Sequence, residues 1–256
     1  MKKAILAVSY GTAYTDALSA SVEATENTFR TSFPDHAVRR AFTGKRIIEM
    51  LAKKGIHVES VDEALAHLAD EGYEEVVVQP THIIGGNEYE SITATVENWR
   101  DRIPNIKVGT PLLHSREDIE MLCKFFAGTY GSAADAVVLM GHGSDHAANS
   151  LYAEFGETCR TLGYNRLLIA TLEASPSIDD IIPQLKADGV QSVVITPLLF
   201  VAGGHACRDM AGGEPGSWKS RLEAEGFTVT AVVKGLGEYD AIRRLYAEHL
   251  RYTLAT

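Results

Sequence analysis

The chain has 256 residues, of which 45% are hydrophobic, and its formal net charge is -10 at pH 7. This composition predicts a globular protein with a substantial buried core, arranged as one large domain or two smaller ones. The acidic balance and the lack of a dense Lys/Arg run exclude a track for a phosphate backbone, so nucleic acid is not expected as a partner.

The amino terminus places two lysines before a short apolar run, Ala4-Ile5-Leu6-Ala7-Val8. The run is too short for a signal peptide and lacks a small-residue cleavage site, so it predicts a first buried strand. No stretch reaches the roughly 20 apolar residues of a membrane span. We therefore expect a cytoplasmic protein without a membrane partner. Its three cysteines lack CxxC spacing, which argues against a disulfide framework or a structural zinc site.

Strand-like runs alternate with amphipathic helical segments along the whole chain, which is typical of βα units around a mainly parallel sheet. In the first half, strands are expected at 3–9, 37–43, 75–81 and 106–112, and helices at 16–31, 45–54, 61–71, 88–101 and 115–127. In the second half, strands are expected at 135–141, 166–171, 191–197 and 227–233, and helices at 147–161, 178–188, 217–225 and 239–251. Residues 128–132 have linker composition. The predicted fold is α/β, with two similar four-stranded lobes at 1–130 and 131–256.

Two sequence echoes indicate an internal duplication. The segment VSYGT at 8–12 resembles MGHGS at 140–144, and residues 79–87 resemble residues 196–205 with one inserted residue. A repeat that occurs only twice implies two lobes and not a solenoid. In this alignment Tyr10 stands opposite His142 and Asn87 opposite His205, so the predicted chemistry is retained in the second lobe.

Potential metal ligands follow three successive strands of that lobe: His142, Glu173 and His205. The carboxyl ends of parallel strands share one edge, where open α/β folds bind ligands. Two imidazoles and a carboxylate suit a divalent cation such as cobalt, iron, nickel or zinc. Each residue also has an ordinary structural interpretation. His142 could be a turn histidine bonded to a carbonyl, and Glu173 a loop charge or a charge at a helix N-terminus.

Two loops of the first lobe are further candidates. Ser9, Tyr10, Gly11 and Thr12 offer hydroxyls and backbone N–H groups just before a helix, which suits a phosphate or carboxylate. The loop lacks the Gly-Lys-Ser/Thr ending of a P-loop, and no GxGxxG motif follows a strand, so a dinucleotide is not indicated.

The second loop contains Gly85 and Gly86 and is followed by Glu88. A carboxylate in the first turn of a helix is the default interpretation of Glu88. It could equally face the ligand-binding edge and accept or relay a proton.

Taken together, the motifs resemble those of the anaerobic cobalt chelatases of cobalamin synthesis, within the class II chelatases that include ferrochelatase. The resemblance spans essentially the whole chain. It is carried by VSYGT (8–12), AFT (41–43), HIIGGNEYE (82–90), MGHG (140–143), PLLFVAGGHA (197–206), DM (209–210), SWK (217–219) and GLGE (235–238).

The resemblance implies that a tetrapyrrole, sirohydrochlorin, binds in a cleft between the lobes and receives cobalt(II) with release of two protons. It implies His142 and His205 as metal-binding and catalytic residues, with Glu173 as third ligand and Glu88 as a functional carboxylate. No tightly bound cofactor is expected; the metal is a substrate, and iron(II) or nickel(II) stay alternatives. Because the chain is acidic, local donors must bind the substrate carboxylates: Gly11, Thr12, Gly85 and Gly86 through their N–H groups, or Lys45, Arg46 and Arg208.

Three alternatives stay open at this point. Two imidazoles and a carboxylate scarcely distinguish cobalt from iron, so an iron-inserting chelatase of sirohaem or haem is one. A non-catalytic protein that binds a tetrapyrrole or a metal complex is another. A phosphate-transferring histidine enzyme is disfavoured, because no Arg directly precedes His142. Apolar faces of surface helices, such as the one expected at 239–251, permit self-association into a homo-oligomer, but they serve the core equally well.

Overall fold

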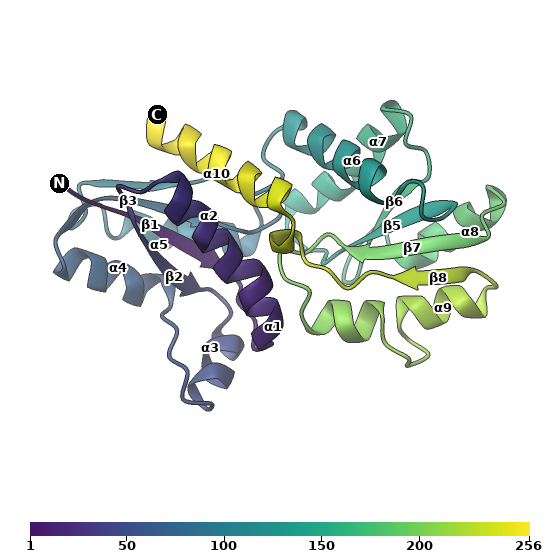
Figure 1. Cartoon of the computed structure of the whole chain (residues 1–256), viewed down its shortest axis with the longest axis horizontal. Helices are drawn as coiled ribbons and strands as arrows, with labels where there is room; N and C mark the ends of the chain where they lie inside the picture. The colour runs from purple at the N-terminus through teal and green to yellow at the C-terminus, as the bar shows by residue number, and fades with distance from the viewer. The chain divides into compact units, whose positions relative to one another are not determined.

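The computed structural model describes all residues from 1 to 256 and divides them into two compact units (Figure 1). Unit 1 combines Met1–Leu112 with Leu236–Thr256, and unit 2 is Leu113–Gly235. Each unit has a four-stranded sheet in which every strand pairing is parallel. The predicted α/β fold with two similar four-stranded lobes is confirmed.

Unit 1 has the strand order β2-β1-β3-β4. Its strands are β1 (Lys2–Ser9), β2 (Ala37–Phe42), β3 (Tyr73–Pro80) and β4 (Asn105–Val108). Its helices are α1 (Thr15–Ala17), the π-helical η1 (Leu18–Glu23), α2 (Ala24–Ser32), α3 (Lys45–Ala52), α4 (Val61–Asp70), α5 (Asn87–Glu97), the 3-10 turn η4 (Leu236–Glu238) and α10 (Asp240–Ala255). No helix in the chain is both long and apolar enough to cross a bilayer.

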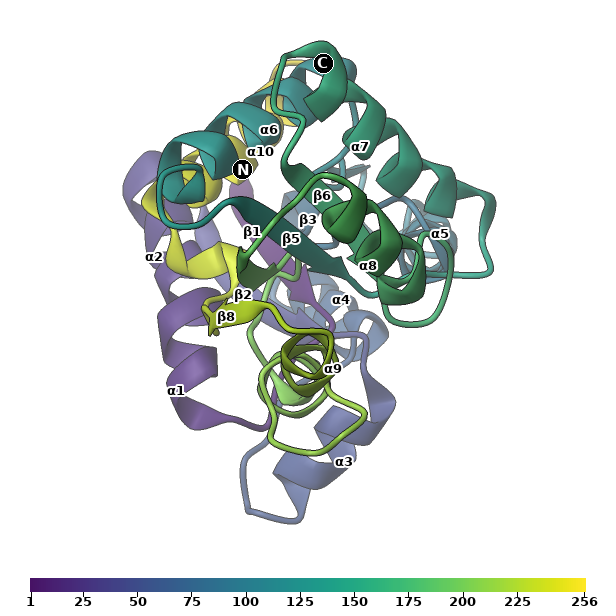
Figure 2. The ribbon, with the colours of Figure 1, turned by 90° about the vertical axis from the view of Figure 1, so that its right-hand side faces the viewer.

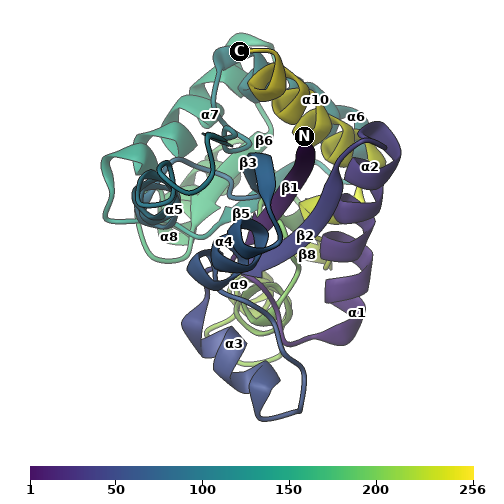
Figure 3. The ribbon, with the colours of Figure 1, turned by 90° about the vertical axis from the view of Figure 1, so that its left-hand side faces the viewer.

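The sheet of unit 1 is covered on both faces, as its continuous apolar strands require. Ala4, Leu6 and Val8 of β1 pack with the buried faces of α4 and α5 in one apolar cluster. On the other face α10 packs against both α2 and β3. Figure 3 shows these two helical layers on opposite sides of the sheet, with α3 apart from both.

Unit 2 has the corresponding order β6-β5-β7-β8. Its strands are β5 (Ala136–Gly141), β6 (Leu167–Thr171), β7 (Ser192–Pro197) and β8 (Thr228–Ala231). Its helices are α6 (Arg116–Tyr130), the 3-10 turn η2 (Ala147–Asn149), α7 (Ser150–Thr161), α8 (Ile178–Ala187), the π-helical η3 (His205–Met210) and α9 (Trp218–Ala224).

The central strand of unit 2, β5, is buried along its whole length. Val138 and Met140 contribute to an apolar cluster that includes α8 and α9. The helices α6 and α7 contact each other and β6 on the second face. In Figure 2, α6 and α7 lie on one side of the labelled strands of this unit, and α8 and α9 lie on the other side.

Capping boxes define the starts of three helices. In each, a serine side chain accepts a hydrogen bond from a backbone N–H three residues later, whose own carboxylate accepts from the serine N–H. The pairs are Ser60 with Glu63, Ser115 with Asp118, and Ser177 with Asp180. These bonds lower the pKa of the Glu63 and Asp180 carboxyls. The helix starts predicted near 61, 115 and 178 thus have a local chemical cause.

The division between the units differs from the predicted boundary at 130/131 by two helices. Helix α6 belongs to unit 2, where it packs on α7, and α10 returns to unit 1. Tyr246 of α10 is fully buried, and its hydroxyl donates a hydrogen bond of 2.7 Å to the Thr81 carbonyl at the end of β3. The apolar face of α10 therefore completes the core of unit 1, which sequence order alone could not indicate.

The same strand order in both units supports the inferred duplication, with β1 to β4 corresponding to β5 to β8. In each unit the chain first moves to one side of the first strand and then crosses to the other side. This reversal creates a switch point beside the first and third strands, where open α/β sheets bind ligands at the carboxyl edge. In unit 2 the switch point lies between β5 and β7.

Candidate functional site

His142 follows β5 directly, between two glycines that the local packing requires. A Cβ on Gly141 would lie 2.7 Å from Cε1 of Tyr152. Gly143 has φ of +87°, and a Cβ there would lie 2.8 Å from the Ala174 backbone nitrogen. Glycine alone relieves both constraints, so these residues bring the His142 backbone close to neighbouring loops.

The Tyr152 ring packs against this loop at Gly141. The residue is 2% exposed, and burial raises the pKa of its phenol to about 12. The backbone groups of Gly143 and His142 hydrogen-bond to the phenol and favour its ionised form, but burial dominates. The phenol is therefore a neutral structural support at ordinary pH.

His205 is the first residue of the π-helical turn η3, in a segment between the strand expected at 191–197 and the helix expected at 217–225. Its Nδ1 lies 2.6 Å from Oδ2 of Asp209, four residues later. No role was expected for Asp209, although a His-x-x-x-Asp spacing brings two side chains together on a helical turn. The carboxylate restrains the imidazole of His205 in one orientation.

The two histidines lie together in the structure. Their ring centroids are 5.0 Å apart and their planes are nearly perpendicular, at 89°. Nδ1 of His142 faces the Gly143 carbonyl at 3.1 Å, and Nδ1 of His205 faces the Asp209 carboxylate. An oxygen acceptor at Nδ1 favours the tautomer that has its proton there. Nε2 of each ring then has a free lone pair for a metal ion.

Glu173 lies next to His142, on the loop after β6. Its Oε2 is 3.7 Å from Nδ1 of His142, and its backbone N–H donates to the His142 carbonyl at 2.9 Å. Glu173 lies outside α8, whose first turn is capped by Ser177 and Asp180, so it is not a charge at that helix end. Its side chain is 61% exposed and those of the two histidines are 44% exposed.

The three predicted ligands are neighbours, but they do not converge on one point. No group of three or more His, Cys, Asp or Glu side chains is arranged as a formed metal site anywhere in the chain. Glu173 is on the Nδ1 side of His142, which is the side away from the free lone pair. What the structure brings together is an exposed imidazole pair with an adjacent, solvent-exposed carboxylate.

The first predicted substrate loop lies at the carboxyl end of β1. Ser9 is 3% exposed, and its hydroxyl has no hydrogen-bond partner. Gly11 has φ of +95°, and a Cβ there would lie 2.4 Å from the Phe42 ring. Thr12 accepts a hydrogen bond from the Tyr14 backbone N–H at 3.1 Å, whereas Tyr10 is 49% exposed. The loop therefore has a fixed backbone and an exposed aromatic side chain.

The second predicted loop follows β3 and leads into α5. Gly86 is the N-cap residue of that helix, and Glu88 is an exposed carboxylate in its first turn, as the ordinary interpretation expected. Gly85 and Gly86 have φ outside the left-handed region. His82 differs from its neighbours, because both of its ring nitrogens are shielded from solvent without a hydrogen-bond partner. Burial lowers the pKa of His82 to about 4.

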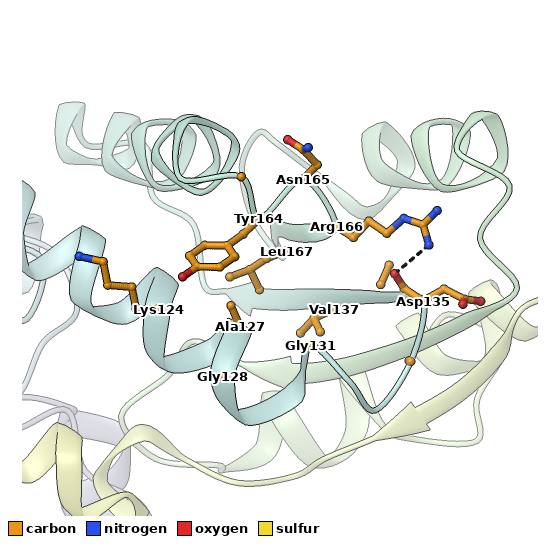
Figure 4. A pocket seen from close by; sticks show the side chains of 13 residues that line it. Lys124, Ala127, Gly128, Gly131, Asp135, Val137, Tyr164, Asn165, Arg166 and Leu167 are labelled. Atoms are coloured by element: carbon orange, nitrogen blue, oxygen red, sulfur yellow. Dashed lines mark hydrogen bonds between the residues drawn. The ribbon is translucent and has the colours of Figure 1, made fainter.

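A surface pocket of about 590 Å³ lies in unit 2 at the amino ends of β5 and β6 (Figure 4). Lys124, Tyr164 and Arg166 line it, and Arg166 donates to the Asp135 carbonyl at 3.5 Å. The amino ends of parallel strands lie at the sheet edge opposite to the one that carries His142. The pocket is therefore separate from the imidazole pair.

Comparison with known sequences shows a match along almost the whole chain. Residues 3–255 match the family described as cobalt chelatase (CbiK). The chain is 37% identical to a sirohydrochlorin cobaltochelatase from Salmonella typhimurium, over 99% of this chain and 97% of the relative. It is also 37% identical to the sirohydrochlorin cobaltochelatase CbiKC from Nitratidesulfovibrio vulgaris, over 97% of this chain and 89% of the relative.

Solved structures with much lower sequence identity share the fold. The sirohydrochlorin chelatase SirB from Bacillus subtilis subspecies spizizenii, in complex with cobalt, has a TM-score of 0.68 at 13% identity. That comparison covers 99% of this chain and 95% of SirB. SirB from Bacillus subtilis with Fe3+ has a TM-score of 0.67 at 16% identity, covering 100% of this chain and 96% of the other.

Replacing Gly143 with Ala should destabilise unit 2 and displace His142. A non-glycine residue in the left-handed region costs roughly 1–2 kcal/mol, and the contact with the Ala174 nitrogen adds to this. Urea unfolding and the NMR resonances of the His142 ring would measure both effects. The control is Gly128→Ala on α6, where a Cβ meets nothing within 4 Å. It should be stabilising by about 0.5–1 kcal/mol, and equal behaviour of the two variants would contradict the interpretation.

His82 should make the free energy of unfolding depend on pH. Its pKa is about 4 in the folded state and roughly 6.5 in an unfolded chain, so the unfolded state binds more protons between these values. The stabilisation is present above pH 6.5 and is lost as pH falls toward 4, by up to about 3 kcal/mol. Unfolding of wild type and His82→Leu at several pH values would isolate this contribution, because all carboxyl groups are common to both. Parallel pH profiles would contradict it.

Proposed function

The chain belongs to the cobalt chelatase (CbiK) family, and we propose that it performs the family reaction at the imidazole pair of His142 and His205. The reaction is that of a sirohydrochlorin cobaltochelatase: cobalt(II) enters the tetrapyrrole and two pyrrole protons leave. The observation that supports this location is the 5.0 Å approach of two exposed imidazoles at the switch point of unit 2.

Metal transfer requires ligands that bind a divalent ion and then release it. Two imidazoles that offer Nε2 are ligands of intermediate softness, which suits cobalt(II) or iron(II). A site with open coordination positions lets the pyrrole nitrogens replace protein ligands one at a time, which a closed four-ligand site would hinder. The partial exposure of both rings suits this exchange.

Glu173 is our proposed third ligand. Its side chain is 61% exposed and lies next to His142, with Oε2 3.7 Å from Nδ1 of that ring. A carboxylate would neutralise part of the charge of the bound metal ion. Glu88 and the imidazoles are the proposed acceptors for the pyrrole protons.

Asp209 is a positioning residue in this proposal. A carboxylate bonded to Nδ1 of a metal-binding histidine fixes the ring orientation, holds the proton on Nδ1 and increases the basicity of Nε2. The 2.6 Å contact between Asp209 and His205 has this geometry. Nδ1 of His142 has a weaker acceptor, the uncharged Gly143 carbonyl. We therefore expect His205 to be the more strongly oriented ligand.

Cobalt(II) is the metal that the family and the relatives name, and iron(II) is the alternative that the donor set allows. Cytoplasmic location and self-association stay predictions from the sequence. A non-catalytic tetrapyrrole-binding protein has no specific observation in its favour, because the exposed imidazole pair would be superfluous for binding alone.

His142→Ala and His205→Ala should each abolish cobalt insertion without unfolding the protein, since both rings are partly exposed and neither contributes to an apolar core. Anaerobic absorbance with sirohydrochlorin and cobalt(II) would measure initial rates, and iron(II) would be run in parallel. The matched control is His67→Ala, an exposed histidine on α4 that pairs with Glu59. Wild-type rates in both folded site variants would exclude this location.

Asp209→Asn should weaken the binding of cobalt(II) to the protein in the absence of tetrapyrrole. Loss of an outer-shell carboxylate commonly costs about 10–100-fold in metal affinity. The visible d–d absorption of bound cobalt(II) would report affinity and ligand geometry, and Asp209→Glu should recover part of both. An unchanged cobalt spectrum and affinity in Asp209→Asn would remove Asp209 from the site.

A further inference from the structure

The helix α3 and the loop that follows it, residues 45–57, differ from the rest of unit 1 in both packing and charge. We refer to them as the α3 segment. Leu51 is the only buried residue of the helix. Figure 1 and Figure 3 show the segment projecting from the unit, beyond the carboxyl end of β2. A helix that contributes so little to the core has its surface available for a ligand.

The cations of the α3 segment have no partners. Lys45, Arg46, Lys53 and Lys54 are all exposed, and none takes part in an ion pair or a side-chain hydrogen bond. Glu49 is the only acidic residue among them, so the segment is strongly basic in a chain whose net charge is -10.

The cations of the preceding strand provide the contrast. Arg39 pairs with Glu71 at 3.1 Å, and Arg40 binds Glu26 at 2.6 Å. Unpaired cations therefore do not occur throughout this part of the fold. They gather where the chain leaves the sheet.

The segment also exposes apolar side chains. Met50 is 42% exposed and Ile56 is 39% exposed, and both rank among the few large hydrophobic residues exposed in the whole chain. Scattered single apolar residues on a surface need no explanation, but here they alternate with unpaired cations on one short element. The combination fits a ligand that has an apolar body and several anionic groups.

The segment is continuous with the loop at the end of β1. The Gly44 backbone N–H donates to the Tyr10 carbonyl at 3.0 Å. A Cβ on Gly44 would lie 3.0 Å from Cε1 of Tyr10 and 3.2 Å from Cγ1 of Ile47. Tyr10, which is 49% exposed, therefore adjoins the first turn of α3. Both lie at the carboxyl edge of the sheet of unit 1.

We propose that the α3 segment, together with Tyr10, captures the polycarboxylate tetrapyrrole. The four cations bind carboxylates at the rim of the macrocycle, and Tyr10, Ile47 and Met50 contact its apolar face. The inference rests on the proposed function for the identity of the ligand. It explains how an acidic protein attracts an acidic substrate: charges within about 8 Å dominate at physiological ionic strength, so a local basic surface outweighs the distant net charge.

The test measures the Kd of metal-free sirohydrochlorin by absorbance titration. It compares wild type with two double variants, K45Q/R46Q and K53Q/K54Q. Each should raise the Kd at least threefold, and their combination at least tenfold, with a shallower dependence of Kd on salt. In the insertion assay the KM should rise while kcat at saturating substrate is unchanged. Met50→Ser with Ile56→Ser should raise the Kd while leaving the salt dependence intact.

The charge-matched control is R100Q/R102Q. These exposed arginines precede β4 and therefore lie at the opposite edge of the same sheet. This variant loses the same charge as each double variant but should leave Kd and its salt dependence unchanged. If the control raised the Kd as much as the α3 variants do, net charge alone would explain the effect, and the inference would be overturned.

The remaining outcomes separate this inference from the proposed function. Wild-type Kd and KM in the combined α3 variant, with cobalt insertion intact, would overturn the inference alone. Failure of the wild-type protein to bind sirohydrochlorin or insert cobalt would overturn both. Vesicles containing phosphatidylglycerol supply a further arm: binding that is lost in the variant, with Kd for sirohydrochlorin unchanged, would assign the segment to a membrane surface instead.

Discussion

The pairing of β5 with β7 is the constraint on which the candidate site depends. Their parallel register aligns Met140 with Pro197, and the Leu198 backbone N–H donates to the Met140 carbonyl at 2.8 Å. His142 thus leaves the sheet beside the chain that leads to His205. Both strands are buried by apolar side chains that form one cluster with α8 and α9, so the rim is a rigid platform. Binding residues on loops that a rigid sheet positions are a common arrangement in α/β proteins.

The duplication shows what one rim can become when its side chains change. Unit 1 has the same strand order and also a switch point, between β1 and β3. At the position of His142 it has Tyr10, an exposed aromatic, and at the position of His205 it has Asn87 in the first turn of α5. The backbone is retained where the chemistry differs: Gly11 and Gly143 both have left-handed φ at the turn that follows the first strand. Selection for the turn and selection for the ligand are therefore separable in this fold.

Much of this architecture could be predicted from the sequence, for a physical reason. Apolar runs such as the one in β5 have no other low-energy environment than a two-sided core, and capping boxes at Ser60, Ser115 and Ser177 are local chemistry. The long-range choices were not predictable. Whether α10 covers unit 1 or unit 2 depends on which apolar surface it completes. Tyr246 fixes it to unit 1, because its ring is buried there and its hydroxyl donates to the Thr81 carbonyl. The pattern Gly-His-Gly predicted a ligand at His142, yet nothing in the spacing of apolar residues predicted a π-helical turn at His205.

That unpredicted turn has the greatest consequence for the chemistry. As a loop residue, His205 would have many orientations and no defined tautomer. As the first residue of η3, it places Nδ1 beside Asp209, so that Nε2 is the nitrogen left for a metal ion. The site is then asymmetric: one imidazole is oriented by a carboxylate and the other by a backbone carbonyl, which is a weaker acceptor. In the proposed reaction, unequal ligands would favour stepwise release, with the less strongly oriented imidazole giving up the metal first. Such an order would keep the metal bound to one imidazole at the midpoint of the proposed transfer, while the first pyrrole nitrogens replace the other.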